Sequence, residues 1–324
     1  MIAIVLIAIA SGAASALMFV SIVSGALISL VLFNLAPLPL MVAAIGWGPL
    51  CAAIGGVAAA SVFGLLFGMS FSVAYATTAA LPAWWLGHLA LLGRQAANAA
   101  PATNGAAPPA NTIEWYPTGR LLLWISAIAV MLAFVTLLTI SSDADVIMAA
   151  MKRGFARVVR LFEQRGITVD EGVVDKMTAI APAGIPVGPM IILTINLCLA
   201  GKIAVTSGRL NRPWPDLKAT ALPPMTLVAL CVALAFCFTG GLLAVFAKVI
   251  AGALLAAYAL TGLAVLHTLT LSSSNRAMWL VLSYVVTIVL MWPLLIMAML
   301  GLADAIFGFR ERFMRTRPPP LPAA

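Results

Sequence analysis

Residues 2–20 read IAIVLIAIASGAASALMFV, an apolar run that contains no Asp, Glu, Lys or Arg. About 20 such residues in a helix match the hydrocarbon thickness of a bilayer. Ala14-Ser15-Ala16 resembles a signal-peptidase site, but no basic residue precedes the apolar run as a secretory signal requires. We therefore expect residues 2–20 to be retained as the first transmembrane helix.

The composition indicates that lipid surrounds most of the chain. Of the 324 residues, 63% are hydrophobic and 9% are charged, whereas a soluble globular chain has about 45–50% apolar and about 25% charged residues. The mean hydropathy of +1.12 agrees. A compact soluble core cannot hide this much apolar surface, which excludes a soluble enzyme, a secreted domain and a disordered protein.

Apolar runs of similar length recur along the chain and predict further membrane-spanning helices. The predicted fold class is all-α, a polytopic transmembrane helix bundle of about eight to nine spans, with broken helices and one basic amphipathic surface helix. The predicted spans are residues 2–20, 25–47, 49–68, 71–92, 121–140, 174–204, 223–240, 243–271 and 277–302.

One uncharged segment without hydrophobic periodicity divides the chain. Residues 95–111 read QAANAAPATNGAAPPAN, a composition typical of a flexible loop. We therefore expect four parts. They are an N-terminal four-span half at 1–94, a flexible Ala/Pro/Asn-rich loop at 95–117, a C-terminal helical half at 118–309 and a basic, Pro-rich tail at 310–324.

The basic amphipathic helix is predicted at residues 143–166. Apolar side chains recur at helical spacing from Ile147 to Phe162, and Asp143 is placed to cap the first turn. The segment is too charged to span a membrane, so we expect it to lie on the membrane surface. The side chains expected to contact anionic lipid headgroups are Lys152, Arg153, Arg157 and Arg160.

The net charge of +8 comes from basic residues in short connections and in the tail. This distribution favours a lipid bilayer with anionic headgroups as the partner, rather than nucleic acid. The larger group of basic residues lies on the side of the tail, so the positive-inside rule predicts a multi-pass membrane protein with a cytoplasmic tail. The basic connection at 202–218 argues for the opposite orientation.

Two predicted helices carry small residues at four-residue spacing. Such faces let helix backbones approach closely in lipid, where no hydrophobic force drives association. This spacing fits packing within the chain and also docking of a partner membrane protein. The residues are Ala8, Gly12 and Ala16 on the first helix, and Ala52, Gly56 and Ala60 on the third.

Two predicted spans are interrupted near their middle. Asn34, Pro37 and Pro39 break the second, and three prolines between residues 181 and 189 are expected to prevent a regular helix in the sixth. Paired breaks expose backbone donors and acceptors and predict a binding site at the midplane, with simple kinks as the alternative. The candidate small-molecule site comprises Asn34, Pro37, Pro39, Trp84, Trp85 and His88, although the tryptophans also fit an interfacial aromatic belt.

The sequence shows no zinc-protease, P-loop or serine-hydrolase motif, and its two histidines are far apart. We therefore expect no enzyme activity, no metal site and no cofactor, and we expect the four cysteines to be small buried hydrophobes. Near the C-terminus, Asp304 and Arg310 are six residues apart, a spacing that places them poorly on one helix face. This segment is predicted to be a basic anchor or a partner contact.

Several short motifs, in the same order, resemble the YybS-like family of predicted bacterial membrane proteins, domain of unknown function 2232. The motifs are APLPL at 36–40, GWGP at 46–49, LPAWWLGH at 81–88, EWYPTGR at 114–120, LNRPWP at 210–215 and GLADAIFGFRER at 301–312. The order of spans two and three is more distantly similar to that in S components of energy-coupling factor vitamin transporters. In those proteins a small-residue face on the first helix docks the coupling subunit, which implies that role for Ala8, Gly12 and Ala16. The chain departs from S components in its larger number of spans and in its amphipathic helix.

Two functions follow from these features. The first is small-molecule binding or a transport-associated role in the manner of an S component. The second is a membrane scaffold or envelope-assembly factor with no transported substrate. The predicted spans lack the central charged groups that ion coupling normally requires, so binding and scaffolding are the functions retained.

Overall fold

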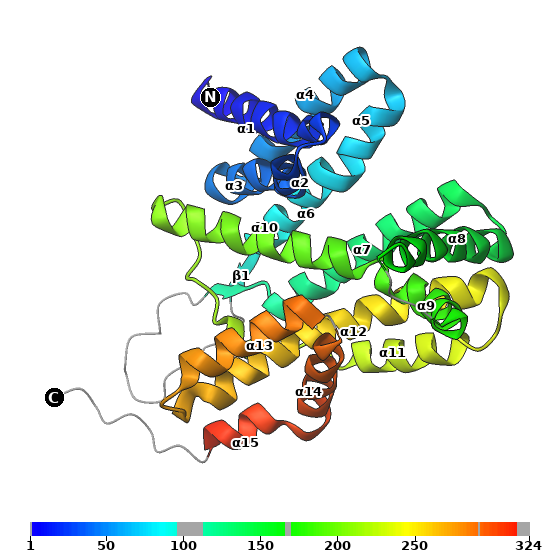
Figure 1. Ribbon diagram of the computed structural model, residues 1–324. Coiled ribbons are helices and arrows are strands. Elements are labelled where there is room, and N and C mark those ends of the chain that lie inside the picture. Colours follow the sequence, from blue (N-terminus) through cyan, green and yellow to red (C-terminus); the bar gives the residue numbers. More distant parts are fainter. Residues whose placement is uncertain (1, 96–112, 166–169, 291, 316–324) are drawn as a thin grey trace. The chain divides into compact units, whose positions relative to one another are not determined.

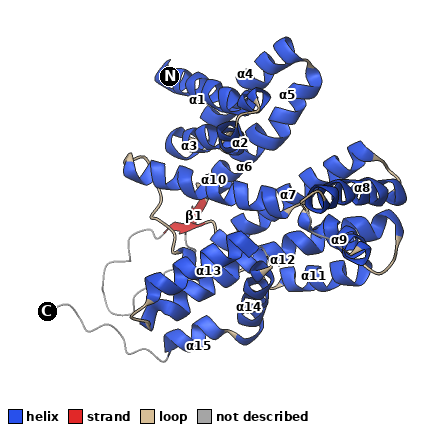
Figure 2. Cartoon of the chain, viewed as in Figure 1, coloured by secondary structure: helices blue, strands red, loops and turns tan. Residues whose placement is uncertain are grey.

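The computed structural model describes residues 2–95, 113–165, 170–290 and 292–315, which are almost entirely helical (Figure 1, Figure 2). The α-helices are α1 (Ile2–Val20), α2 (Leu27–Asn34), α3 (Pro37–Trp47), α4 (Pro49–Phe67), α5 (Met69–Tyr75), α6 (Leu81–Ala90), α7 (Thr118–Ile140), α8 (Ala144–Glu163), α9 (Glu171–Gly184), α10 (Val187–Thr206), α11 (Met225–Phe236), α12 (Gly241–Leu269), α13 (Arg276–Leu290), α14 (Pro293–Phe307) and α15 (Phe309–Arg315). Shorter elements are the 3-10 turns η1 (Ser21–Ser24), η3 (Leu217–Ala219) and η4 (Thr270–Ser272), the π-turn η2 (Ala76–Ala80), and strands β1 (Gly93–Gln95) and β2 (Ile113–Trp115).

The all-α transmembrane fold class is confirmed, whereas the number of eight to nine spans stays a prediction. Six helical segments among the described residues are long and apolar enough to cross a bilayer. They are Ile2–Ser24, Leu27–Trp47, Pro49–Phe67, Thr118–Ile140, Gly172–Thr206 and Gly241–Leu269. Three shorter apolar helices accompany them, at Met225–Phe236, Arg276–Thr287 and Pro293–Phe307. Large apolar side chains on these segments face outward, with Leu27 85% and Leu65 87% exposed, as expected for surfaces in contact with lipid.

The predicted break in the second span is present between α2 and α3. Pro37 and Pro39 lie in the first turn of α3, where a missing N–H leaves no intrahelical hydrogen bond unmade. The predicted interruption within residues 181–189 is also present, but it is short. Pro182 lies within α9, and the helix is interrupted only at residues 185–186 before α10 begins. Pro189 is again in a first turn, which explains why three prolines interrupt so little backbone.

Contacts divide the chain into two compact units, each built from two stretches of sequence. Unit 1 comprises Met1–Ile125 and Ile191–Pro215, and unit 2 comprises Ser126–Met190 and Asp216–Ala324. The units differ from the predicted halves because residues 118–125 and 191–215 pack with the N-terminal part. Of the predicted loop, residues 96–112 lie outside the described part of the chain, and the residues on either side of them pair as β1 and β2.

Unit 1 is held together by close approaches between helix backbones. A Cβ atom on Gly12 would collide with the carbonyl group of Gly55, so α1 lies directly against α4. In the same way Gly87 of α6 admits the side chain of Ala44 of α3. The turns that bring these helices together need left-handed backbone at Gly48 and Gly68, with φ of 101° and 92°, which side chains other than glycine rarely adopt.

Unit 2 is built around α12, the longest helix. Its Gly262 lies against the carbonyl oxygen of Met297, and Gly301 of α14 lies against that of Tyr258, so α12 and α14 are in backbone contact. Gly252 makes a similar approach to Ala183 of α9. The first half of the predicted amphipathic helix, α8, buries Ile147 against Leu137 and Val249.

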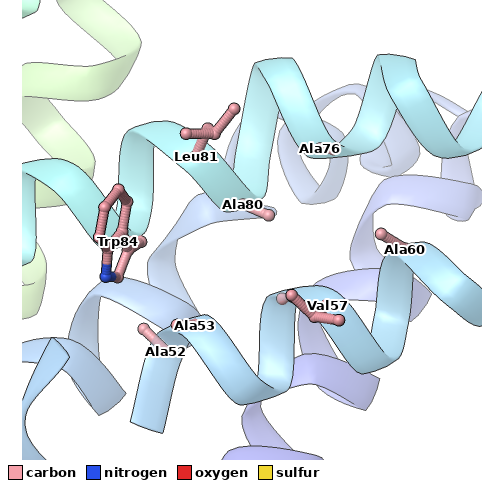
Figure 3. A pocket seen from close by; sticks show the side chains of 9 residues that line it. Ala52, Ala53, Val57, Ala60, Ala76, Ala80, Leu81 and Trp84 are labelled. Carbon is pink, nitrogen blue, oxygen red and sulfur yellow. The ribbon is translucent and has the colours of Figure 1, made fainter. Parts of the chain in front are cut away.

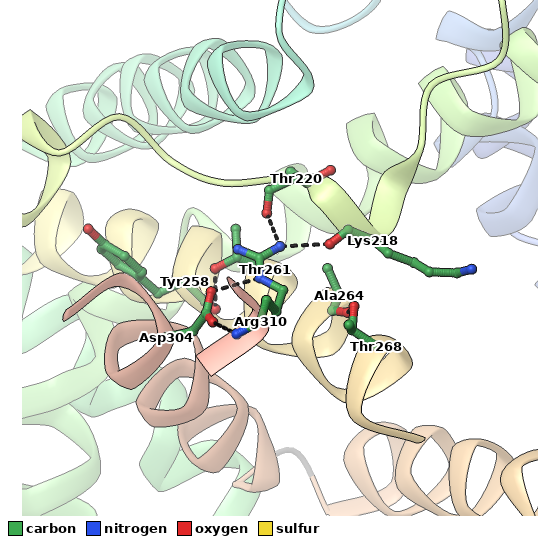
Figure 4. Close-up of polar contacts among 8 residues, drawn as sticks. All are labelled: Lys218, Thr220, Tyr258, Thr261, Ala264, Thr268, Asp304 and Arg310. Carbon is green, nitrogen blue, oxygen red and sulfur yellow. Dashed lines mark hydrogen bonds and ion pairs between the residues drawn. The ribbon is translucent and has the colours of Figure 1, made fainter. Parts of the chain in front are cut away.

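The α14–α15 junction contains a buried ion pair that sequence spacing did not predict (Figure 4). Arg310 Nε donates to Asp304 Oδ2 at 2.7 Å, and the backbone N–H of Arg310 donates to Oδ1 at 2.9 Å. The two residues meet because the chain turns at Gly308, whose φ is 65°, rather than continuing as one helix. The guanidinium also donates to the carbonyl oxygens of Lys218 and Thr220. Residues 316–324 of the predicted tail lie outside the described residues.

Candidate functional site

An apolar groove lies between α4 and the continuous wall formed by η2 and α6 (Figure 3). Its volume is about 300 Å³ and its lining is almost wholly apolar. The two walls run antiparallel, since Ala52 faces the Trp84 end and Ala60 the Ala76 end. The lining residues, hereafter the groove, are Ala52, Ala53, Gly56, Val57, Ala60, Ala76, Ala80, Leu81 and Trp84.

Small residues on α4 create this groove. Gly56 would place a Cβ atom 3.0 Å from the Cβ atom of Ala80, so any larger side chain there would fill the space between the walls. Ala52, Gly56 and Ala60, predicted as a packing or docking face, all line the groove. A neighbouring face of α4, at Gly55, receives Ala8 and Gly12 of α1. The α1 positions are therefore occupied by α4, and Ala16 is half-buried one turn further along.

The structure does not gather the six predicted ligand residues into this groove. Trp84 lines it, whereas Asn34, Pro37 and Pro39 do not. Asn196 Nδ2 donates to the carbonyl oxygen of Asn34 at 2.9 Å.

A second buried hydrogen bond closes the same break. Ser15 Oγ donates to the carbonyl oxygen of Ala36 at 2.7 Å, and Tyr75 Oη donates to Ser15 Oγ at 2.9 Å. Side chains thus satisfy acceptors that a broken helix would otherwise leave free in lipid. Ser15 and Tyr75 gave no signal in the sequence that distinguished them from other polar residues of the spans, since only the fold brings them together.

Trp84, Trp85 and His88 continue from the groove as an aromatic ladder along α6. Trp84 stacks near His88 with ring centroids 6.4 Å apart, and Trp85 packs edge-on against Trp124 of α7 at 5.1 Å. Trp124 Nε1 donates to the hydroxyl oxygen of Tyr116. The ladder therefore leads from the apolar groove to the polar end of α6, as in the aromatic belts of membrane interfaces.

A family model described as "Predicted membrane protein (DUF2232)" matches residues 13–305. The chain belongs to this family. It is a predicted membrane protein with several helices able to cross a bilayer. No curated protein and no solved structure matches the chain, so the distant similarity to S components stays a prediction.

In this DUF2232 protein, three cations lie over indole rings at one end of unit 1. Lys202 Nζ is 4.3 Å from the ring centroid of Trp214, the Arg209 guanidinium is 5.0 Å from Trp47, and that of Arg212 is 5.6 Å from Trp115. Such stacking holds a cation in place while leaving its N–H groups able to donate elsewhere.

Two of these cations lie beside the ends of α3 and α6, since Arg209 stacks over Trp47, the last residue of α3, and Arg212 contacts α6. Arg212 Nη1 donates to the carbonyl oxygen of Ala90, the last residue of α6, at 2.8 Å. Partial burial lowers the pKa of the Arg212 guanidinium from its ordinary value, although an arginine remains charged in proteins. The nearby β-hairpin adds an exposed ion pair between Arg94 and Glu114.

Every charged side chain of unit 1 is found in this region, which we call the basic end. The sequence of 1–93 contains none, and 191–201 contains none. The charged residues of the basic end are Arg94, Glu114, Arg120, Lys202, Arg209 and Arg212. Five cations and one carboxylate give this end a net charge of +4.

The basic residues predicted to contact headgroups lie on α8 in unit 2. Lys152 pairs with Asp175 of α9, with 2.5 Å between Nζ and Oδ1. Arg153, Arg157 and Arg160 are exposed. Asp143 caps α8 by accepting from the N–H of Asp145, which confirms the predicted start of this helix.

Among the residues that the structure describes, no three His, Cys, Asp or Glu side chains lie close enough together to hold a metal ion. The groove of unit 1 is the candidate site for a ligand because of its shape and lining. It offers an apolar wall, an aromatic end and neighbouring cations.

Proposed function

We propose that this protein binds an amphiphilic small molecule in the groove of unit 1, as a membrane-embedded binding protein in a transport-associated role. One observation carries the proposal: an open apolar groove of about 300 Å³ formed by small residues on α4. Ligand sites of this size are concave and mostly apolar, with few polar groups that fix orientation. The lining selects an apolar chain, because a polar ligand would lose hydration there without gaining hydrogen bonds.

Binding rather than catalysis is the role proposed, and neither a metal nor a cofactor is needed for it. The protein is placed, as part of the same proposal, in the bacterial inner membrane with its tail on the cytoplasmic side. That orientation follows from the basic residues of α8 and the tail under the positive-inside rule.

A membrane scaffold or envelope-assembly factor is the alternative function. Its predicted docking residues on α1 pack against α4, since Ala8 is fully buried and Gly12 contacts Gly55. A partner would therefore need another surface. This packing favours ligand binding over scaffolding through that face.

Filling the groove provides the test. Ala53→Phe places an aromatic ring between the walls, and the amount of lipid or other small molecule that co-purifies with the protein is expected to fall at least ten-fold, a loss of about 1.4 kcal/mol in binding. Mass spectrometry of organic extracts measures this amount. Ile54→Phe is the matched control, because Ile54 is 45% exposed and does not line the groove.

A second variant keeps the test informative if Ala53→Phe misfolds. Ala76→Leu narrows the opposite end of the groove and is expected to lower the bound amount in the same way. If both variants keep as much bound ligand as the wild type, or if the wild type carries none, ligand binding in the groove is refuted.

A further inference from the structure

We infer that the ligand of the groove is a bilayer lipid with an anionic phosphate headgroup, whose headgroup is held by the basic end of unit 1. This inference rests on the proposed function and names its substrate class. It depends on the uneven distribution of charge in unit 1. The apolar groove leads toward the end of the unit that contains all of its charged side chains.

The direction of the groove supports this placement. Ala52 lies in the first turn of α4, five residues after Trp47, over which Arg209 stacks. On the opposite wall, Trp84 is followed along α6 by Ala90, whose carbonyl oxygen accepts from Arg212. Both walls therefore end, at the Trp84 side, next to cations.

The dimensions agree with those of a lipid. Six residues of helix separate Trp84 from Ala90, which is about 9 Å along the axis. The headgroup region of one leaflet is roughly 5–8 Å thick. An acyl chain in the groove would thus bring its phosphate to the level of the basic end.

The charges of the basic end select an anion. The sequence places five cations and one carboxylate there, and Glu114 is already paired with Arg94. Lys202 and Arg209 are exposed, and each is steadied by an indole ring. Arginine donates in a planar fork that matches two phosphate oxygens.

The opposite end of unit 1 cannot offer the same recognition. The turns at residues 21–26 and 67–69 contain no charged residue. A lipid in the groove with its headgroup at that end would meet no cation. The asymmetry of charge therefore fixes the direction of the ligand.

The experiment uses the full chain in nanodiscs that contain equal amounts of phosphatidylglycerol and phosphatidylethanolamine with identical acyl chains. Native mass spectrometry after release counts each lipid bound per protein. The wild type is expected to retain phosphatidylglycerol in preference to phosphatidylethanolamine. In the Lys202→Gln/Arg209→Gln double variant the preference is expected to fall at least ten-fold, since each cation near a membrane surface contributes roughly a five-fold factor.

Two controls separate charge from structure. Arg165→Gln/Lys176→Gln removes the same charge from exposed positions of unit 2 that are given no headgroup contact, and is expected to leave the preference unchanged. Arg209→Lys keeps a cation over Trp47 and is expected to retain most of the preference.

The outcomes distinguish this inference from the proposed function. Equal retention of both lipids by the wild type, or an unchanged preference in the double variant, overturns the anionic headgroup while groove binding stands. Both proposals are supported if Ala53→Phe loses both lipids and if, among the charge variants, only Lys202→Gln/Arg209→Gln loses the preference for phosphatidylglycerol.

Discussion

Gly262→Leu is expected to destabilise the protein by at least about 3 kcal/mol, the upper range for overpacking of a buried contact. A Cβ atom at this position would collide with the carbonyl oxygen of Met297, which is backbone and cannot rotate away. The helices α12 and α14 would have to separate, and both Gly262 and Gly301 would lose their contacts. We expect the apparent melting temperature in detergent to fall by roughly 10 °C, as measured by size-exclusion after heating.

Gly154→Leu is the matched control for this substitution. Gly154 lies within α8 and a Cβ atom there would meet open space. Since leucine forms helix better than glycine, the control is expected to be neutral or to stabilise by about 0.5 kcal/mol. A similar melting temperature for Gly262→Leu and the wild type would show that α12 and α14 do not pack through these glycines.

Asp304→Ala is expected to cost about 3 kcal/mol of folding stability, because it leaves the Arg310 guanidinium buried without its counter-charge. The side chains of Asp304 and Arg310 are only 6% and 15% exposed, so water cannot replace the lost partner. The variant also removes the acceptor for the N–H of Arg310 at the Gly308 turn. Thermal denaturation in detergent measures the loss.

An exposed ion pair in the same unit gives the comparison. Asp175→Asn breaks the contact with Lys152, whose side chain is 57% exposed, and is expected to change stability by less than about 1 kcal/mol. The double variant Asp304→Leu/Arg310→Met is expected to recover much of the loss, since no unpaired charge remains. If Asp304→Ala is no worse than Asp175→Asn, the buried pair contributes little to the fold.

Much of the helical architecture could be predicted from apolar runs alone. Residues 2–20 were predicted as a helix, and α1 has the same bounds. The predicted start and charge of α8 were also correct, because a capping aspartate and a 3.6-residue period are local signals. The number of spans stays a prediction, since α11, α13 and α14 are apolar but have fewer than the about 20 residues of a typical spanning helix.

The candidate site was only partly visible in the sequence. Trp84 and the small residues of α4 were singled out, but as parts of two different sites. The groove exists because small residues of α4, such as Gly56, face Ala80 on the other wall. Local periodicity in the sequence does not show which distant segments will face each other in this way. The sequence alone shows that the charged residues are unevenly distributed, since Arg94 is the first charged residue of the chain. That these charges lie beside the groove could be seen only in the folded structure.

The discontinuous make-up of unit 1 has a consequence for biosynthesis. Residues 126–190, which belong to unit 2, are translated before residues 191–215, which complete unit 1. Domains generally fold as they emerge from the ribosome. Here the carbonyl oxygen of Asn34 can accept its hydrogen bond only after Asn196, 162 residues later, has been translated. The ribosome has made 196 of the 324 residues, about three fifths of the chain, before this hydrogen bond at the joint between α2 and α3 can form. Formation of this hydrogen bond is therefore a late event in synthesis and marks the moment when the nascent N-terminal helices become a finished unit.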